Sequence, residues 1–403
     1  METAVAQPLS ERIQKMEESA TIAMAQKARE FKAKGIDVIS LSLGEPDFKT
    51  PKHIQEAAKQ AIDEGKYFGY SPVPGYLDLR EAIAEKLQRD NGLTYTPNQI
   101  VVSTGAKQSI ANVFLCLLDP GDEVIVYSPY WVSYAEIIKI AEGVPVPIMG
   151  SLENNFKATA DQLKAAITPR TKAVIFSSPC NPTGAVFSRE EMEAMAGVLS
   201  QHPNIYVVAD EIYEYINFRD EHVSIASLPG MYDNTITING FSKGYAMTGW
   251  RLGYIAAPEW IAKACGKIQG QFTSGTNSIA QRAAIAALKG DMSASQEMKA
   301  AYQRRRDLVL DLLKDVPGVE TYVPTGAFYL FPDISAYFGK SDGEITIENA
   351  DDFCMYILNQ AHVSMVTGDA FGAPNCIRLS FAASDEQLKE AMQRIKEVLA
   401  KLH

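Results

Sequence analysis

Two hydrophobic periodicities alternate along this chain of 403 residues. Stretches in which apolar positions recur every three or four residues predict amphipathic helices, and short Val- and Ile-rich runs predict strands. Several of these runs are apolar at consecutive positions, which is typical of strands covered by helices on both faces of a sheet. The predicted helices are Ser19–Ala33, Pro51–Glu64, Leu77–Asn91, Glu190–Leu199, Glu297–Leu313 and Asp385–Leu402, and the predicted strands are Gln99–Ser103, Glu123–Ser128, Ala173–Ser178, Ile205–Ala209, Thr235–Asn239 and Gly253–Ala257.

Strands separated by helices predict an α/β fold with a mostly parallel central sheet in three layers. The pattern becomes shorter after about residue 315, which indicates a smaller α/β domain at 315–403 beside a large domain at 46–314. The N-terminal segment 1–45 is expected to fold back onto the small domain. The elements predicted for that domain are strands at Ala327–Phe331, Val363–Val366 and Ile377–Phe381 and helices at Ala350–Gln360 and Asp385–Leu402.

Charge and composition exclude several classes of partner. The chain has 38 Lys and Arg against 49 Asp and Glu, a net charge of -11, whereas nucleic acid and anionic membranes require a dense basic surface. We expect neither a membrane-spanning helix, which needs roughly twenty apolar residues, nor a secretory signal in the polar segment Met1–Glu18. The five cysteines form no Cys-x-x-Cys pair, so we expect no metal site, no disulfide framework and a cytoplasmic location.

Candidate chemistry follows the predicted strands, because ligands of open α/β sheets bind at the carboxyl ends of strands. The Gln99–Ser103 run leads into Gly105-Ala106-Lys107 and a helical pattern, and a tight turn before a helix binds anions. Asn181 precedes a proline, which holds it extended with its amide free to point out of the strand end. Taken alone, a strand-Gly-helix turn and an Asn-Pro turn also have ordinary structural explanations.

Two further strand ends carry opposite charges. Asp210 directly follows the apolar run Ile205–Ala209, where a carboxylate requires a functional partner or a structural ion pair. Lys243 lies in a Gly- and aromatic-rich loop after Thr235–Asn239, and desolvation there lowers a lysine pKa and makes the amine nucleophilic. With Arg251 nearby and the anion-binding turn, these groups match the phosphate, ring nitrogen and aldehyde of pyridoxal 5'-phosphate (PLP).

Seven segments show that the sequence resembles the class I aminotransferases of PLP fold type I over essentially its whole length. The similarity is greatest to the bacterial-type aspartate aminotransferases. The resemblance implies a large three-layer domain with a smaller α/β domain built from the C-terminal part and the N-terminal segment. The seven segments are Ser42–Phe48, Ser103–Gln108, Asp119–Tyr134, Asn181–Val186, Ala209–Glu214, Ser242–Tyr254 and Ile377–Ala382.

The resemblance assigns roles around the cofactor. It implies that Lys243 forms the internal aldimine and later moves a proton between the substrate Cα and the cofactor. Asp210 is expected to pair with the ring nitrogen, Tyr213 and Asn181 to hydrogen-bond the phenolic oxygen, and Trp131 to stack on the ring. The phosphate-binding residues implied are Gly105, Ala106, Ser242 and Arg251, with Lys107 beside them and with Tyr70 from the neighbouring subunit of a homodimer.

The resemblance also implies a substrate site. Arg378 is expected to bind the α-carboxylate by a planar two-point contact beside the Gly44 backbone. The segment Gly270–Asn277 contains no arginine, whereas the animal-type enzymes read the distal carboxylate with an arginine there. The bacterial type uses a lysine and a threonine, which Lys107 and Thr21 match. The implied substrate contacts are Gly44, Thr21, Lys107, Trp131, Asn181 and Arg378.

The expected activity is ping-pong transfer of the amino group from L-aspartate to 2-oxoglutarate, forming oxaloacetate and L-glutamate. An alternative is the same reaction on prephenate, aromatic amino acids or kynurenine. Another alternative is a PLP lyase or synthase, such as an aminocyclopropane-carboxylate synthase. A regulator built on this fold is not expected, because such a protein requires an appended DNA-binding module and the catalytic fold fills the chain.

Overall fold

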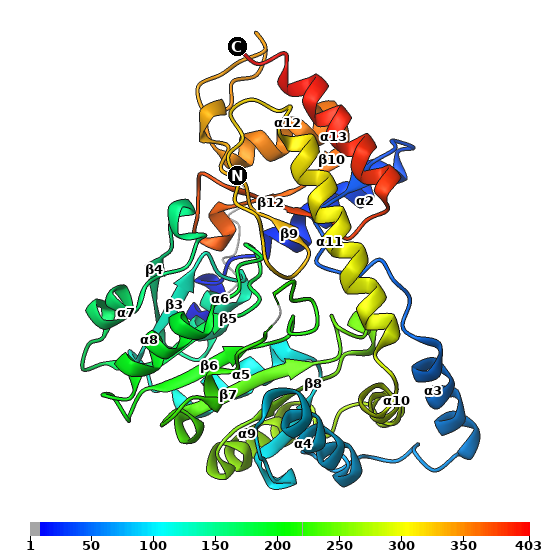
Figure 1. Cartoon of the computed structure of the whole chain (residues 1–403), viewed down its shortest axis with the longest axis vertical. Helices are drawn as coiled ribbons and strands as arrows, with labels where there is room; N and C mark the ends of the chain where they lie inside the picture. Colours follow the sequence, from blue (N-terminus) through cyan, green and yellow to red (C-terminus); the bar gives the residue numbers. More distant parts are fainter. Residues whose placement is uncertain (1–8, 220) are drawn as a thin grey trace, which may run out of the picture.

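The computed structural model describes residues 9–219 and 221–403. Its largest element is a seven-stranded sheet (Figure 1). The strands are β2 (Ile100–Ser103), β3 (Glu123–Ser128), β4 (Val144–Met149), β5 (Thr171–Ser177), β6 (Tyr206–Asp210), β7 (Thr235–Gly240) and β8 (Gly253–Ala256). They lie in the order β2-β8-β7-β6-β5-β3-β4. Only β8 runs against its neighbours β7 and β2 in this sheet, so the carboxyl ends of the other six strands share one edge.

Helices cover both faces of this sheet. They are α3 (Lys52–Glu64), α4 (Leu77–Asn91), α5 (Ala106–Leu117), α6 (Ser133–Ile140), α7 (Ala160–Ala166), α8 (Arg189–Leu199), α9 (Glu259–Phe272) and α10 (Ser278–Lys289). Successive strand side chains point to opposite faces. In β3, Val124 and Val126 therefore pack in the core formed with α5, α6 and α9, whereas Ile125 and Tyr127 pack in the core formed with α7 and α8.

A second region of the chain, with a hydrophobic core of its own, lies beyond the carboxyl edge of the sheet. It contains residues from both the N-terminal and the C-terminal parts of the chain. Its helices are α2 (Ala20–Ala33), α11 (Ser293–Leu313), α12 (Ala350–Ala361) and α13 (Asp385–Leu399), while the short α1 (Glu11–Gln14) precedes α2. Figure 1 shows α11 crossing from the side of α10 to α12 and α13.

Two small sheets complete this second region. The strands are β1 (Ile39–Ser40), β9 (Tyr329–Leu330), β10 (Val363–Ser364), β11 (Val366–Thr367) and β12 (Ile377–Ser380). β12 pairs antiparallel with β11 and β9, and β1 pairs parallel with β10. The pairing of β1 anchors the N-terminal segment, so the residues that follow β1 lead directly toward the main sheet.

The predicted α/β class with a mostly parallel sheet is confirmed, and the differences in detail have local causes. The predicted strand at Gln99 begins at Ile100, because Pro97–Gln99 forms a 3-10 turn. Asp210 is the last residue of β6 rather than the first residue after it. The edge strand β4 was not predicted, because its sequence VPVPIM carries two prolines and is largely exposed, whereas strand runs are recognised by burial and by the absence of proline. Among the described residues, no helix has both the length and the apolar character that a bilayer crossing demands.

Candidate active site

A cavity of about 440 Å³ lies where the carboxyl ends of β3, β5, β6 and β7 face the second region of the chain. Strands that run in one direction bring their following loops to one edge, so residues distant in sequence meet there. The structure brings together twelve of the fourteen predicted site residues. These lining residues are Thr21, Gly44, Ala106, Lys107, Trp131, Asn181, Asp210, Tyr213, Ser242, Lys243, Arg251 and Arg378.

Gly105 lies at the rim, where it forms an anion-binding turn with Arg251. Gly105 precedes the first residue of α5 and has φ of +84°, a left-handed conformation that a side chain would strain. A Cβ atom on Gly105 would lie 2.5 Å from Nη2 of Arg251. The guanidinium therefore lies next to the unpaired N–H groups of the first turn of α5, an arrangement that suits a phosphate dianion.

Asp210 is a buried carboxylate held by neutral donors. The Tyr134 hydroxyl donates to its Oδ2 at 2.6 Å and the Ile212 N–H donates to its Oδ1 at 3.2 Å. Burial raises the pKa of Asp210 to about 6, although these hydrogen bonds oppose the rise. A cationic N–H group placed against this carboxylate would stabilise its charged form.

Lys243 lines the same cavity as Asp210 and is partly buried beside two aromatic rings. Its Nζ donates to the Gly44 carbonyl and lies 5.6 Å from the ring centroid of Tyr213 and 5.9 Å from that of Phe328. Burial lowers the pKa of Lys243 to about 8, while the Glu45 carboxylate opposes this shift. A neutral amine is therefore accessible near neutral pH, which nucleophilic attack on an aldehyde requires.

Arg378 is buried with one donor unused. It is 1% exposed, and its Nη1 and Nη2 donate to Asn181 Oδ1 at 2.9 Å and to the Ser42 carbonyl at 2.6 Å. Its Nε has no hydrogen-bond partner. Burial lowers the pKa of Arg378, and the phenol groups of Tyr329 and Tyr213 oppose that shift. An arginine with an unsatisfied edge in a cavity is suited to binding a carboxylate.

Lys107 and Trp131 both line the cavity and lie against each other. The Lys107 Nζ lies 4.9 Å from the Trp131 ring centroid, and Trp131 in turn meets Tyr134 edge-on at 5.6 Å between centroids. Burial, together with the positive charge of Arg251, lowers the pKa of Lys107. The Thr21 hydroxyl in the same cavity is buried without a partner, so it remains available to a ligand.

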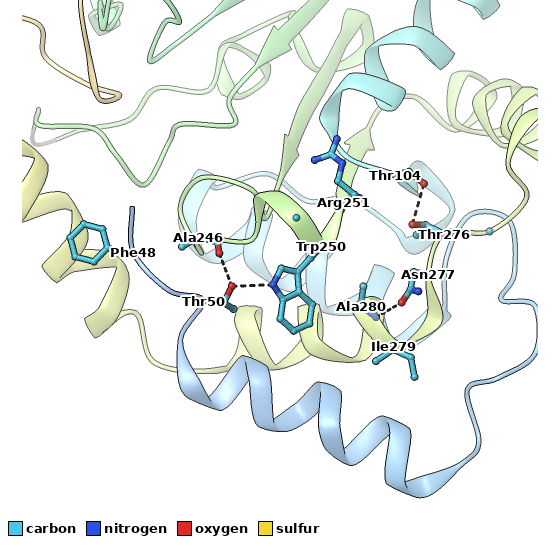
Figure 2. Close-up of a pocket in the computed structure, with 12 residues that line it drawn as sticks. Phe48, Thr50, Thr104, Ala246, Trp250, Arg251, Thr276, Asn277, Ile279 and Ala280 are labelled. Carbon is cyan, nitrogen blue, oxygen red and sulfur yellow. Dashed lines mark hydrogen bonds between the residues drawn. The ribbon is translucent and has the colours of Figure 1, made fainter. Parts of the chain in front are cut away.

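Tyr70 is the predicted residue that a single chain does not bring to the site. It is fully exposed in the segment between α3 and α4 and does not line the cavity. A second hollow of about 810 Å³ opens on the far side of Arg251, among Thr50, Trp250 and Thr276 (Figure 2). This hollow gives access to the anion-binding turn from outside the chain.

Eight residues that line the cavity were missed by sequence reasoning, and three of them, Tyr134, Tyr329 and Glu45, have polar groups next to predicted site residues. Tyr134 lies in one of the resembling segments and holds Asp210, while Tyr329, in the predicted strand Ala327–Phe331, hydrogen-bonds Tyr213 at 2.7 Å between hydroxyl oxygens. Glu45 lines the cavity beside Gly44. The available signal was a polar atom on an otherwise apolar run, which normally requires a partner when buried.

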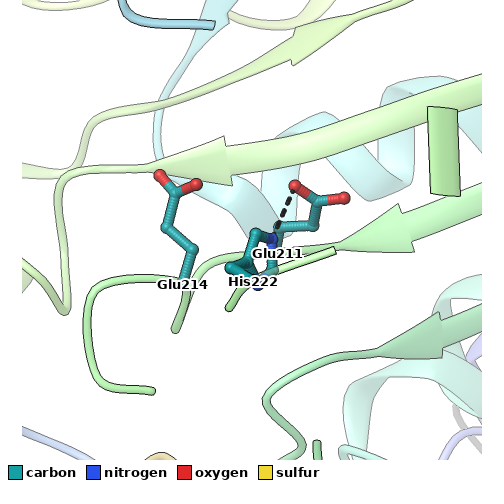
Figure 3. Close-up of side chains that lie close together, drawn as sticks. All are labelled: Glu211, Glu214 and His222. Atoms are coloured by element: carbon teal, nitrogen blue, oxygen red, sulfur yellow. Dashed lines mark hydrogen bonds and ion pairs between the residues drawn. The ribbon is translucent and has the colours of Figure 1, made fainter. Parts of the chain in front are cut away.

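A buried polar cluster lies behind the site, next to Asp210 in sequence (Figure 3). Glu211 accepts from His222 Nε2 at 3.1 Å and from the Ser224 hydroxyl at 2.6 Å. Glu214 pairs with the buried Lys86 ammonium, 2.5 Å from its Oε1. The three side chains of Glu211, Glu214 and His222 have ligand atoms close enough to hold a cation. However, Lys86 already provides a positive charge at Glu214, so the cluster is best described as an internal ion-pair network.

The residues present fit PLP. The turn at Gly105 and Arg251 offers N–H groups to a phosphate, Asp210 offers a buried carboxylate to a ring nitrogen, and Lys243 offers an amine to an aldehyde. The unused Nε of Arg378 and the unpartnered Thr21 hydroxyl show that the cavity has polar groups awaiting a ligand. This combination of groups defines a PLP-dependent enzyme.

Comparison with known proteins places the chain in a family. The model of the "Aminotransferase class I and II" family matches residues 36–395. An aspartate/prephenate aminotransferase of Cereibacter sphaeroides is 47% identical over 98% of this chain and 99% of its own length. The aspartate aminotransferase structures of Rhizobium meliloti and Thermus thermophilus, the latter with maleate, are each 42% identical, with TM-scores of 0.94 and 0.91. They cover 98% and 97% of this chain and all of their own chains.

The chain therefore belongs to the class I and II aminotransferase family. It is a PLP-dependent aminotransferase with the fold of the aspartate aminotransferase structures. The family, fold and cofactor predicted from the sequence are confirmed.

The ion-pair network of Glu211 and His222 predicts a pH-dependent stability. Burial opposes the charged form of His222, but the Glu211 charge and hydrogen bond outweigh it and raise the His222 pKa. Its contribution to stability is full below the unfolded-state value of about 6.5 and disappears as pH rises through the higher folded-state pKa. His222→Gln should therefore be most destabilising near pH 6 and progressively less so above neutrality. Urea unfolding across this range measures the difference, and a constant difference would refute the pairing; His202→Gln, elsewhere in the chain, should parallel the parent.

Proposed function

We propose that the chain is an aspartate aminotransferase that transfers the amino group of L-aspartate to 2-oxoglutarate. The observation that carries this proposal is a single cavity in which two further cations, the buried Arg378 and the solvent-exposed Lys107, accompany Lys243 and Arg251. Both substrates are dicarboxylates, and the two further cations are each suited to one carboxylate. The activity of the relatives and the maleate bound to the Thermus thermophilus enzyme support this substrate class.

The proposed roles of the cofactor-binding residues follow from their environments. When bound, PLP supplies the aldehyde that accepts the amino group and a protonated ring that withdraws electrons from the substrate Cα. Asp210 binds the ring N–H, Tyr213 and Asn181 hold the phenolic oxygen, and Trp131 covers one ring face. Gly105, Ala106, Ser242 and Arg251 hold the phosphate, with Lys107 nearby.

The proposed substrate chemistry is carried out by four side chains and one backbone group. Arg378 holds the α-carboxylate beside Gly44, which orients the Cα–H bond toward Lys243. Because burial lowers the pKa of Lys243, its amine removes the proton at Cα and returns it in the reverse half-reaction. Lys107 and Thr21 bind the distal carboxylate at the other end of the cavity.

A second substrate, prephenate, is favoured by a specific observation. The Cereibacter sphaeroides relative is an aspartate/prephenate aminotransferase. The Lys107 ammonium lies over the Trp131 ring. It is a compact charge on a flexible side chain, whereas the guanidinium of an arginine is a rigid, planar group. The ammonium can follow a carboxylate that lies at different distances from the reacting carbon in two substrates.

We also propose the assembly, domain division and location. A homodimer is supported by the full exposure of Tyr70 and by the hollow beside Arg251, which a partner's Tyr70 fills to reach the phosphate. The division into an N-terminal segment 1–45, a large domain 46–314 and a small domain 315–403 is supported by the β1–β10 pairing. The five cysteines are unbridged, which is the usual state of thiols in the cytoplasm.

Lys243→Ala should abolish transamination and the visible absorbance that arises when the cofactor aldehyde is joined to a lysine. The reason is that the variant lacks the amine that both binds the aldehyde and moves the Cα proton. Steady-state assays with aspartate and 2-oxoglutarate, together with the absorption spectrum, measure both effects. Lys263→Ala, on the exposed face of α9, is the matched control and should behave as the parent. Turnover comparable to the parent in Lys243→Ala would reject the assignment.

Lys107→Ala tests how the distal carboxylate is read. A charge-assisted contact contributes about 1.5–3 kcal/mol, so kcat/KM for aspartate and 2-oxoglutarate should fall roughly tenfold to a hundredfold. Phenylalanine has no distal carboxylate, so its kcat/KM should change little. Measuring both specificity constants and the PLP affinity in one preparation distinguishes binding of the distal carboxylate from binding of the phosphate. Equal losses on both substrates with weaker PLP binding would show that Lys107 serves the phosphate instead.

Tyr70→Phe tests the contribution of the partner subunit. Loss of a hydroxyl that contacts a phosphate should weaken PLP binding by about tenfold or more, while the dimer remains intact in sedimentation velocity. Tyr67→Phe is the matched control, because Tyr67 packs edge-on against Tyr76 in its own chain. A fully active monomer in sedimentation would contradict the proposed assembly.

A further inference from the structure

A seam of side-chain contacts joins α5 to α9, and it begins beside the anion-binding turn. At the end nearest Gly105, the Thr104 hydroxyl donates to Thr276 Oγ1 at 3.3 Å. One turn into α5, Gln108 Nε2 donates to Thr273 Oγ1 at 2.7 Å. The two helices are therefore in direct contact from the first turn of α5 onward.

The same seam continues along both helices. Asn112 Nδ2 donates to Gln269 Oε1 at 3.0 Å, and both side chains are buried. From Gln108–Thr273 to Asn112–Gln269 the contact moves four residues later in α5 and four residues earlier toward the start of α9, whereas the step from Thr104–Thr276 to Gln108–Thr273 is four residues and three. This spacing is one helical turn, which is the signature of two antiparallel helices packed along a shared line.

The next position in this register is occupied by two cysteines. Cys116 lies four residues after Asn112 and Cys265 lies four residues before Gln269, so the register places the two thiols side by side, and each thiol shifts the pKa of the other. Cys265 is fully buried in the core between the sheet and these helices, whereas Cys116 is partly exposed. The register of the helices and the mutual pKa effects thus both indicate that two thiols far apart in sequence lie together.

The environments of the two thiols differ in a way that suits redox chemistry. The hydrogen bond from Cys265 lowers the pKa of Cys116, against the effect of burial, and the same contact with burial raises the pKa of Cys265. Burial also raises the pKa values of Cys180, Cys354 and Cys376. Cys116 therefore combines solvent access with the greatest tendency to ionise, and the thiolate is the reactive form.

We propose that Cys116 and Cys265 form an oxidation site for peroxides that closes the α5–α9 seam with a reversible disulfide. The Cys116 thiolate attacks one peroxide oxygen, the O–O bond breaks, and the leaving oxygen takes a proton to give water or an alcohol. Cys116 is then a sulfenic acid. The Cys265 sulfur attacks the Cys116 sulfur and loses its proton, the S–O bond breaks and water leaves. Two thiols are oxidised by two electrons in total, and one peroxide is reduced.

The site differs from the active site in chemistry and in place. It lies three turns along α5 from the turn that holds the phosphate, and it uses neither Lys243 nor any other residue that lines the cavity. Its connection to that turn is α5 itself, because the seam fixes the orientation of the helix whose first N–H groups bind the anion. Disulfides in reducing compartments are typically transient and redox-sensing.

The test uses the full-length holoenzyme treated with hydrogen peroxide, followed by blocking of free thiols and digestion without reduction. The accessible thiol count after denaturation should fall from five by two per chain. A peptide pair containing Cys116 and Cys265 should appear in the mass spectrum and disappear after dithiothreitol. Absence of this pair, or a Cys116 sulfinic acid with Cys265 still a free thiol, would overturn the proposal.

Three variants separate the proposed pair from general oxidation. In Cys265→Ser, Cys116 should stop at a sulfenic acid that a dimedone probe traps, because no second thiol attacks it. In Cys116→Ser, Cys265 should remain reduced, since it is buried. Cys180→Ser is the matched control, because Cys180 has similar partial exposure, and it should form the disulfide as fast as the parent. Equal disulfide formation in Cys265→Ser and the parent would reject the site.

Discussion

A carboxylate buried at the end of a central strand is the constraint on which the site depends. Asp210 ends β6, and its hydrogen bonds come from the neutral donors Tyr134 and the Ile212 N–H. Burial raises its pKa to about 6, so its charged form is less favourable than that of an exposed carboxylate, and a cation in contact with it stabilises that form. In the proposed function the ring nitrogen of PLP is that cation. Cofactor binding and ionisation of Asp210 therefore favour each other, because a ligand that binds only one protonation state stabilises that state.

The cationic side chains of the cavity require anionic ligands, just as Asp210 requires a cationic one. The chain has a net charge of -11, yet Lys107, Lys243, Arg251 and Arg378 all line one cavity. The carboxylates of Asp210 and Glu45 line the same cavity, so four cations face two anions there, and this excess of positive charge favours the entry of anions. The phosphate and the substrate carboxylates supply those anions. Both regions of the fold contribute cations to the cavity. Arg378 comes from β12 in the second region, and Lys243 follows β7 of the main sheet.

The sequence by itself determined the class of fold and most of the site, because both depend on local patterns. Apolar runs that alternate with amphipathic stretches indicate buried strands and the helices that cover them. The polar residues that follow an apolar run mark the end of the strand. Gly105, Asp210 and Lys243, with Arg251, could be grouped into one candidate site from their positions after strands, and the family resemblance added Asn181. The reason is geometric, since parallel strands place all their carboxyl ends at one edge of the sheet.

Only the tertiary structure decided which side chains meet within that edge and behind it. Tyr134 was shown to hold Asp210, and Cys116 to meet Cys265, through helices whose docking and rotation no local pattern encodes. Tyr70 lies outside the site of its own chain, so its proposed role requires a second copy. Such contacts join residues separated by tens to hundreds of positions. They are fixed by close packing of the whole core rather than by the periodicity of any one segment.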